Sequence, residues 1–113
     1  MIADDDPAIL DSVGMLLEFE GYEVITALNC VELLDNKQSI PDLLLLDIWM
    51  SGIDGRDTCK TLKAKDTTSA LPIIMISASK DIGASALSAG ANDFLEKPFQ
   101  INDLLKKIKK HCT

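Results

Sequence analysis

Several apolar runs of this sequence end in a side chain that can bind a cation or a phosphoryl group. These side chains are carboxylates, a hydroxyl and an amine, at Asp4, Asp5, Asp6, Asp47, Ser77 and Lys97. If the runs are parallel strands of one sheet, their carboxyl ends meet at the edge where open α/β sheets bind ligands. The order of these residues along the chain therefore predicts a single site.

The residue types at this predicted edge favour phosphoryl transfer assisted by a metal ion. Crowded carboxylates repel one another, and hard oxygen ligands that leave positions for water and phosphate favour Mg²⁺. A cation and a lysine neutralise the oxygens of a transferred phosphoryl group, and a carboxylate can be the nucleophile. Asp47 is the best placed to attack, because it stands alone after four consecutive leucines.

The elements that would position these groups alternate between strands and helices. Continuous apolar runs at 43–46 and 73–76 are typical of strands buried on both faces. Other strands are expected at 22–27 and 93–95, and helices at 7–20, 31–36, 56–65, 82–89 and 101–108. The alternation predicts a parallel sheet covered by helices on both faces. The first strand would be residues 1–3, short for an interior strand, so we expect it to be truncated.

Composition favours one domain, residues 1–113, without a role in binding nucleic acids or membranes. The chain is 47% apolar, enough for a core at this length. Its net charge of −7 argues against contacts with nucleic-acid phosphates, and the basic cluster at 106–111 is expected to be a solvated helix face. No apolar stretch is long enough to cross a membrane. Three separated cysteines match no disulfide framework or metal pattern, so a cytoplasmic location is expected.

Five short motifs together resemble those of the response-regulator receiver family, in order and spacing. They are ADDDP at 3–7, DLLLLD at 42–47, MSGIDG at 50–55, ISA at 76–78 and EKPF at 96–99. None is specific alone, but the set is. The resemblance, to receiver domains of the chemotaxis-regulator type in two-component signalling, implies a single-domain, flavodoxin-like, doubly wound (βα)5 fold with a five-stranded parallel sheet of order 2-1-3-4-5.

The resemblance also implies a phosphoacceptor and a metal site. Asp47 would accept the phosphoryl group. Asp5 and Asp47 would bind Mg²⁺ directly, and Asp4 would act through water. The backbone carbonyl of Trp49 would supply another oxygen.

A switch mechanism is implied by the same resemblance. Lys97 would pair with Asp47 and then with the phosphoryl group, while Ser77 would move toward a phosphoryl oxygen and Phe94 would follow inward. These changes would alter a partner surface formed by residues 82–89, Phe94 and residues 103–110. The implied partners are a sensor histidine kinase or phosphotransfer protein and an output domain or effector. The domain would be a signalling switch and not an enzyme with external substrates.

Two positions depart from the usual family pattern, and three other functions need weighing. Ser51 stands where proline is usual, and Trp49 is bulkier than many residues at its position.

A haloacid-dehalogenase-type phosphatase needs a second acid where this chain has Trp49. A flavodoxin-type carrier needs a phosphate-binding loop where three aspartates stand. A receiver-like scaffold that signals without phosphorylation has the same fold and stays open as an alternative.

Overall fold

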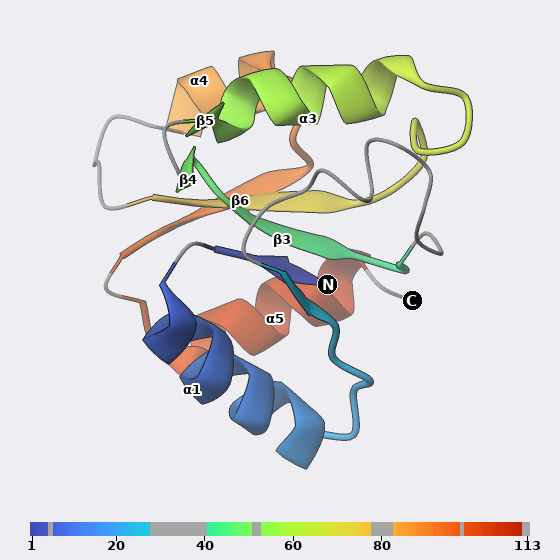
Figure 1. Cartoon of the computed structure of the whole chain (residues 1–113). Helices are drawn as coiled ribbons and strands as arrows, with labels where there is room; N and C mark the ends of the chain where they lie inside the picture. The colour runs from blue at the N-terminus through green and yellow to red at the C-terminus, as the bar shows by residue number, and fades with distance from the viewer. Residues whose placement is uncertain (5, 28–40, 51–52, 78–82, 98, 112–113) are drawn as a thin grey trace.

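A five-stranded parallel sheet forms the centre of the structure (Figure 1). The computed structural model describes residues 1–4, 6–27, 41–50, 53–77, 83–97 and 99–111. The strands are β1 (Ile2–Ala3), β2 (Thr26–Ala27), β3 (Leu44–Asp47), β6 (Ile73–Ser77) and β7 (Asp93–Glu96). Their spatial order is β2-β1-β3-β6-β7, which confirms the expected order 2-1-3-4-5.

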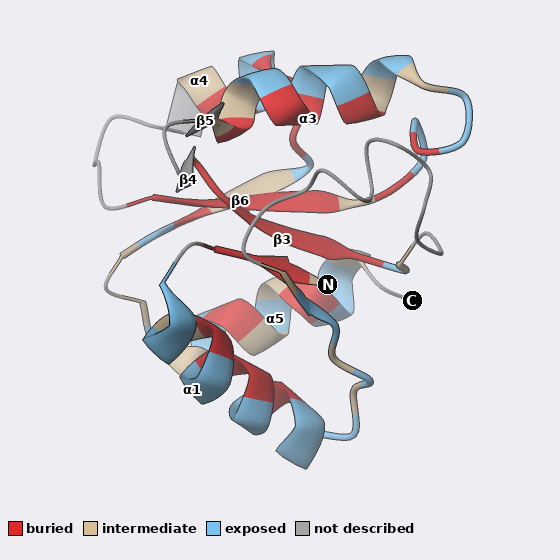
Figure 2. Cartoon of the chain, viewed as in Figure 1, coloured by how far each residue is buried: buried red, intermediate tan, exposed pale blue. Residues whose placement is uncertain are grey.

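Helices cover both faces of this sheet, as Figure 1 shows. Helix α1 (Pro7–Phe19) and helix α5 (Ile101–His111) lie on one face, and helix α3 (Gly55–Ala64) and helix α4 (Gly83–Ser88) lie on the other. Buried residues concentrate in the strands and on the helix faces that point toward them (Figure 2). The predicted doubly wound α/β architecture is therefore confirmed. The helix predicted at 31–36 lies outside the described residues.

The leucine run explains why β3 is central. Successive side chains of a strand point to opposite faces. Leu44 and Leu46 accordingly enter the core cluster with residues of α3 and α4, whereas Leu43 and Leu45 enter the cluster with residues of α1 and α5. Because both faces are covered, the run needs no polar alternation, and Asp47 is its first charged residue.

Local signals set the starts of two helices. The Asp6 side chain accepts a hydrogen bond from the Ala8 amide at 3.0 Å, and Pro7 occupies the first turn of α1. Asp6 is therefore the N-cap of α1. Asp54 caps α3 by accepting a hydrogen bond from the Arg56 amide at 2.9 Å.

The structure differs from the predicted elements in two places. Strand β2 covers two residues where six were expected, because it pairs only with Ile2 and Ala3 of the short β1. After Asp47, where no strand was expected, the chain forms a small antiparallel pair, β4 (Trp49–Met50) with β5 (Ile53–Asp54). Hydrophobic periodicity cannot signal strands of two residues.

Candidate functional site

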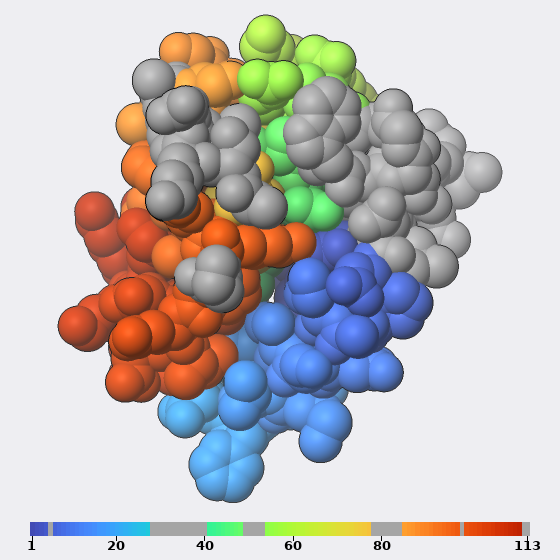
Figure 3. Space-filling view, turned by 90° about the vertical axis from the view of Figure 1, so that its left-hand side faces the viewer, coloured from blue at the N-terminus to red at the C-terminus, as the bar shows by residue number. Residues whose placement is uncertain are grey.

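Three charged side chains from distant parts of the chain meet at the carboxyl edge of the sheet. The Lys97 ammonium nitrogen lies 3.1 Å from Oδ2 of Asp4 and 3.5 Å from Oδ1 of Asp47. The side chains of the two aspartates are only 3% and 11% exposed. Figure 3 looks onto this edge, where the blue start of the chain, the green end of β3 and the orange segment around β7 come together.

Strand pairing explains this convergence. Ala3 pairs with Leu46 in the parallel β1–β3 ladder, so Asp4 and Asp47 follow at the same level on adjacent strands. Lys97 follows β7, and its backbone amide donates to the Ser77 carbonyl at 2.7 Å. Its long side chain then reaches back to the two carboxylates.

Asp4 is fixed by hydrogen bonds through both of its carboxylate oxygens. Its Oδ1 accepts a hydrogen bond from the Asp6 amide at 3.0 Å, and its Oδ2 accepts one from Lys97. Two buried carboxylates thus share one ammonium group. Buried charges need compensation, so a cation beside Asp4 and Asp47 would be stabilised there.

Gly55 packs directly against the backbone that carries Asp47. Its amide donates to the Ile48 carbonyl. A Cβ atom at position 55 would lie 2.5 Å from the Asp47 carbonyl oxygen and 2.9 Å from Cα of Ile48. Real Cβ atoms do not approach backbone this closely, so this position requires glycine. The close packing of Gly55 therefore fixes the backbone at the end of β3.

Ser77, Phe94 and Trp49 are the other predicted site residues that the structure describes. Ser77 is the buried last residue of β6, one position beyond Ile76, which pairs with Asp47. Phe94 lies half-buried on β7 and packs against the core under α3 and α4. Asp5 lies outside the described residues. Trp49 begins β4, two positions after Asp47.

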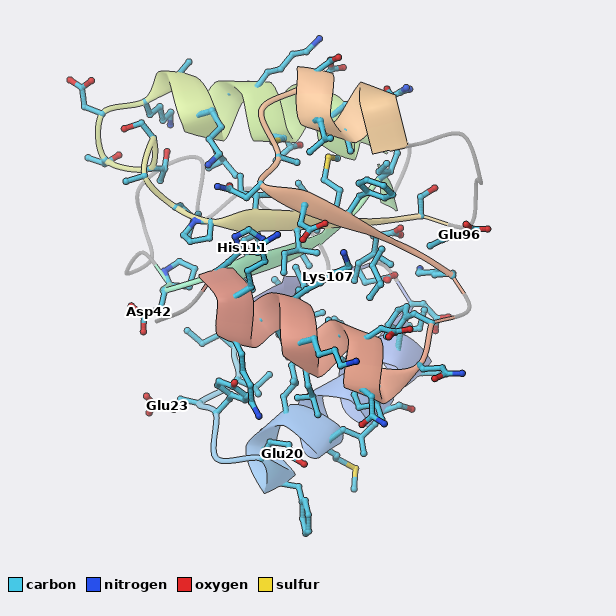
Figure 4. The ribbon with its side chains drawn as sticks, turned by 180° about the vertical axis from the view of Figure 1, so that it is seen from behind. Glu20, Glu23, Asp42, Glu96, Lys107 and His111 are labelled. Carbon is cyan, nitrogen blue, oxygen red and sulfur yellow. The ribbon has the colours of Figure 1, made fainter. Side chains whose placement is uncertain are left out.

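A charged cluster between β7 and α5 was not predicted. Lys107 Nζ lies 2.8 Å from Oδ1 of Asp93, and His111 Nε2 lies 3.2 Å from Oδ2. Lys107 also lies 5.8 Å from the centre of the Phe94 ring. Figure 4 shows Lys107 and His111 extending from α5 toward the sheet. The expectation of a solvated face was therefore wrong for these two residues, whose spacing of four could have signalled a shared partner.

This cluster lowers the pKa of Asp93. Burial alone would raise that pKa, but hydrogen bonds from Lys107, from the Phe94 amide and from His111 favour the charged carboxylate and outweigh burial. Asp93 is therefore held ionised beside Phe94.

A second unpredicted contact links the segment after Asp47 to α4. Arg56 donates through Nε and Nη2 to the Asp54 carboxylate, at 3.0 Å and 2.7 Å, and through Nη1 to Ser85 Oγ at 2.8 Å. The hydrogen bond from Arg56 lowers the pKa of Asp54, although burial opposes the shift.

A separate cavity of about 420 Å³ opens at the opposite edge of the sheet. It is lined by residues near the amino ends of the strands, including Met1, Val24 and Leu43. The cavity therefore lies away from the carboxylates and is not part of the candidate site.

Comparison with known proteins decides the family. The profile described as "Response regulator receiver domain" matches residues 1–109. The chain belongs to this family. Response regulator MprA of Mycobacterium avium is 38% identical over 96% of the chain, which spans 48% of that protein. This receiver domain thus covers about half the length of the curated relatives it matches.

Solved structures show the same fold. The receiver domain of NtrX from Brucella abortus superposes with a TM-score of 0.86 at 34% identity, covering 98% of this chain and 95% of that one. The receiver domain of the sensor histidine kinase PA1611 from Pseudomonas aeruginosa, which holds a magnesium ion in its active-site cleft, gives 0.87 at 24% identity, with 98% and 93% coverage. The chain is thus a signalling switch of two-component systems. Within its described portion, no helix is long and apolar enough to span a membrane.

Proposed function

We propose that residues 1–113 form one receiver domain that accepts a phosphoryl group on Asp47 in a Mg²⁺-dependent reaction. The observation that carries this proposal is the position of Lys97 between the buried carboxylates of Asp4 and Asp47. An ammonium group beside two carboxylates at the carboxyl edge of a parallel sheet places a nucleophile, metal ligands and a positive charge at the edge where such sheets bind ligands, and phosphoryl transfer depends on positioning and on charge stabilisation of this kind.

The residues at this edge fit a magnesium ion. Asp4 and Asp47 provide hard carboxylate oxygens, and Asp5 and the Trp49 carbonyl would add further ligands. Such oxygen ligands suit Mg²⁺, which retains several waters and binds phosphate oxygens. When bound, Mg²⁺ would neutralise charge on the phosphoryl oxygens, and the PA1611 receiver domain is a protein of this fold that holds magnesium.

The side chains of the site would have different roles in the reaction. A carboxylate oxygen of Asp47 would attack the phosphorus of a phosphohistidine or a small phosphodonor, forming an acyl phosphate as the bond to the donor breaks. The Lys97 ammonium would balance the charge of the phosphoryl oxygens, and the Ser77 hydroxyl would donate a hydrogen bond to one of them. Water would later hydrolyse the acyl phosphate and restore Asp47.

The response would pass to the surface formed by α4, β7 and α5. Movement of Ser77 would draw Phe94 inward and shift an equilibrium between two conformations. Phe94 lies next to Asp93 and under Lys107, so its position is coupled to α5. A partner that binds this surface would distinguish the two states.

The implied partners follow from the same reaction. A sensor histidine kinase or phosphotransfer protein would supply the phosphoryl group in the cytoplasm, and an output domain or effector would read the switch. Response regulator MprA is about twice as long as this chain, which is compatible with an output region in that protein. We propose no direct binding of nucleic acid by the receiver domain itself, since its net charge is −7.

The test uses Trp49, the only tryptophan, which stands two residues after Asp47. Its fluorescence is followed during titration with Mg²⁺ and then beryllofluoride, a phosphoryl mimic. We expect a saturable Mg²⁺ response and a further change with beryllofluoride that is absent in Asp47→Asn. If fluorescence and intact mass with a phosphodonor both stay unchanged, the scaffold that signals without phosphorylation becomes the better account.

A further inference from the structure

The side chain of Arg56 joins β5, α3 and α4. Its guanidinium donates through Nε and Nη2 to the Asp54 carboxylate at the end of β5, and through Nη1 to Ser85 Oγ on α4 at 2.8 Å. Figure 1 shows α4 beside the first turn of α3, close to β5. A planar guanidinium can hold two partners at once in a fixed geometry. Arg56 therefore sets the position of α4 relative to the start of α3.

The segment that Arg56 holds is packed against the proposed phosphoacceptor. Gly55 lies between Asp54 and Arg56, and a Cβ atom there would lie 2.5 Å from the Asp47 carbonyl oxygen. The Gly55 amide also donates to the Ile48 carbonyl. Backbone segments in such close contact cannot move independently, because a packed interior transmits a displacement to its neighbours. Arg56 thus connects α4 to the backbone that carries Asp47.

Apolar packing holds α4 only weakly, as far as its described side chains show. The helix has six residues, too few to be stable through its own hydrogen bonds. Its contribution to the core is made by alanines, Ala86 and, just beyond its end, Ala89, whereas Leu87 is 51% exposed. Because alanine buries little apolar area, this packing contributes little. The hydrogen bond from the charged Arg56 side chain is then a substantial part of what fixes α4.

We propose that Arg56 is a positioning residue that, through Ser85, holds α4 in the place it has in the unphosphorylated chain. This inference rests on the proposed function, in which Ser77 moves toward the phosphoryl group. Along the chain, α4 is the next described element after Ser77, so this movement would displace α4 and break the hydrogen bond from Arg56 to Ser85. A bond made in only one of two conformations favours that conformation. Loss of this bond should therefore favour the phosphorylated conformation and tighten the binding of a phosphoryl mimic.

Two variants remove this hydrogen bond in different ways. Ser85→Ala removes the acceptor and leaves the pair of Arg56 with Asp54 intact. Arg56→Lys retains the positive charge but loses the planar fork that reaches both partners. With Mg²⁺ present, each variant should bind beryllofluoride about fivefold more tightly than wild type, the effect expected for one hydrogen bond to a charged group. Titration followed by the fluorescence of Trp49 measures this affinity, and urea unfolding checks that each variant is folded.

The double variant and a neighbouring serine make the test specific. Ser85→Ala combined with Arg56→Lys should bind beryllofluoride no more tightly than either single variant, because both changes remove the same bond. Ser88→Ala is the matched control and should bind as wild type does, because Ser88 lines the same cavity beside α4 whereas Arg56 Nη1 donates to Ser85. Unchanged affinity in Ser85→Ala, or equal tightening in Ser88→Ala, would overturn the proposal.

Hydrogen exchange without Mg²⁺ separates this proposal from phosphoryl transfer. The Ala89 amide donates to the Ser85 carbonyl at 3.1 Å, so its exchange rate reports how firmly α4 is held. We expect about threefold faster exchange in Ser85→Ala and in Arg56→Lys. Alanine is the better helix former, so a purely local effect of Ser85→Ala would slow exchange instead. If wild type binds no beryllofluoride but both variants exchange faster, phosphoryl transfer fails and the link from Arg56 to α4 stands. Exchange at the wild-type rate in both variants would overturn the link.

Discussion

The ammonium nitrogen of Lys97 lies 3.5 Å from Oδ1 of Asp47, although Asp47 ends β3 and Lys97 follows β7. The same nitrogen lies 3.1 Å from Asp4. One lysine thus balances two buried carboxylates, and this shared countercharge links the stability of the fold to the chemistry of the site.

Replacing Lys97 should therefore destabilise the chain most when Mg²⁺ is absent. Lys97→Ala leaves two buried carboxylates without their shared cation, and removing one partner of a buried charge pair costs about 3 kcal/mol. Added Mg²⁺ should restore part of this loss by replacing the positive charge. Urea unfolding with and without Mg²⁺ measures the effect, with Lys60→Ala on the exposed side of α3 as control. A variant as stable as wild type without Mg²⁺ would contradict the shared-countercharge account.

Two glycine-to-alanine changes should have opposite effects. At Gly55 a Cβ would meet the Asp47 carbonyl oxygen at 2.5 Å, so Gly55→Ala should cost about 2 kcal/mol and displace the end of β3. At Gly14, inside α1, a Cβ would meet side chains of Val24 and Thr26 at 3.6 and 3.8 Å, which is ordinary contact. Gly14→Ala should stabilise the helix by about 0.5–1 kcal/mol.

Urea unfolding compares these two variants, and phosphorylation rates show the consequence for the site. Gly55→Ala should be phosphorylated more slowly even in conditions where it is fully folded. Gly14→Ala should react at the wild-type rate. Equal rates for both variants would show that the close packing of Gly55 does not position Asp47.

The charged cluster between β7 and α5 should make the free energy of unfolding depend on pH in the acidic range. The pKa of Asp93 is lowered from 3.8 in the folded chain, so its ion pairs stabilise the fold above 3.8 and this contribution is lost as the pH falls through the lower folded value. Asp93→Asn should lower stability by about 1 kcal/mol at neutral pH. Urea unfolding at a series of pH values should show that the free energies of unfolding of wild type and Asp93→Asn converge below pH 3.8. A difference in the free energy of unfolding between these two chains that widens as the pH falls would contradict the prediction.

Features set by local sequence were predictable here. The leucine run gave a buried strand that ends at Asp47, because a continuous apolar run needs cover on both faces. Asp6 gave the cap of α1, because a cap depends only on its near neighbours. The carboxyl-edge rule placed Asp4, Asp47 and Lys97 together from their order alone.

Features set by packing were not predictable. The pairing of Lys97 with Asp4 depends on how its side chain crosses the sheet edge, which no sequence pattern records. Asp93 and His111 meet because α5 returns across β7, so their contact joins two elements whose relative placement is a tertiary property. Strand β2 is short because β1 offers it only two residues for pairing, Ile2 and Ala3.

The central claim is that Asp47 is the phosphoacceptor, and Asp42 offers a matched control. Both aspartates flank the same leucine run, but Asp42 is exposed at the opposite end. The chain is incubated with acetyl phosphate and Mg²⁺, and its intact mass is measured together with Asp47→Asn and Asp42→Asn. We predict the mass increase of one phosphoryl group in wild type and in Asp42→Asn, lost on removal of Mg²⁺, and no increase in Asp47→Asn. Phosphorylation of Asp47→Asn at the wild-type level would contradict the account.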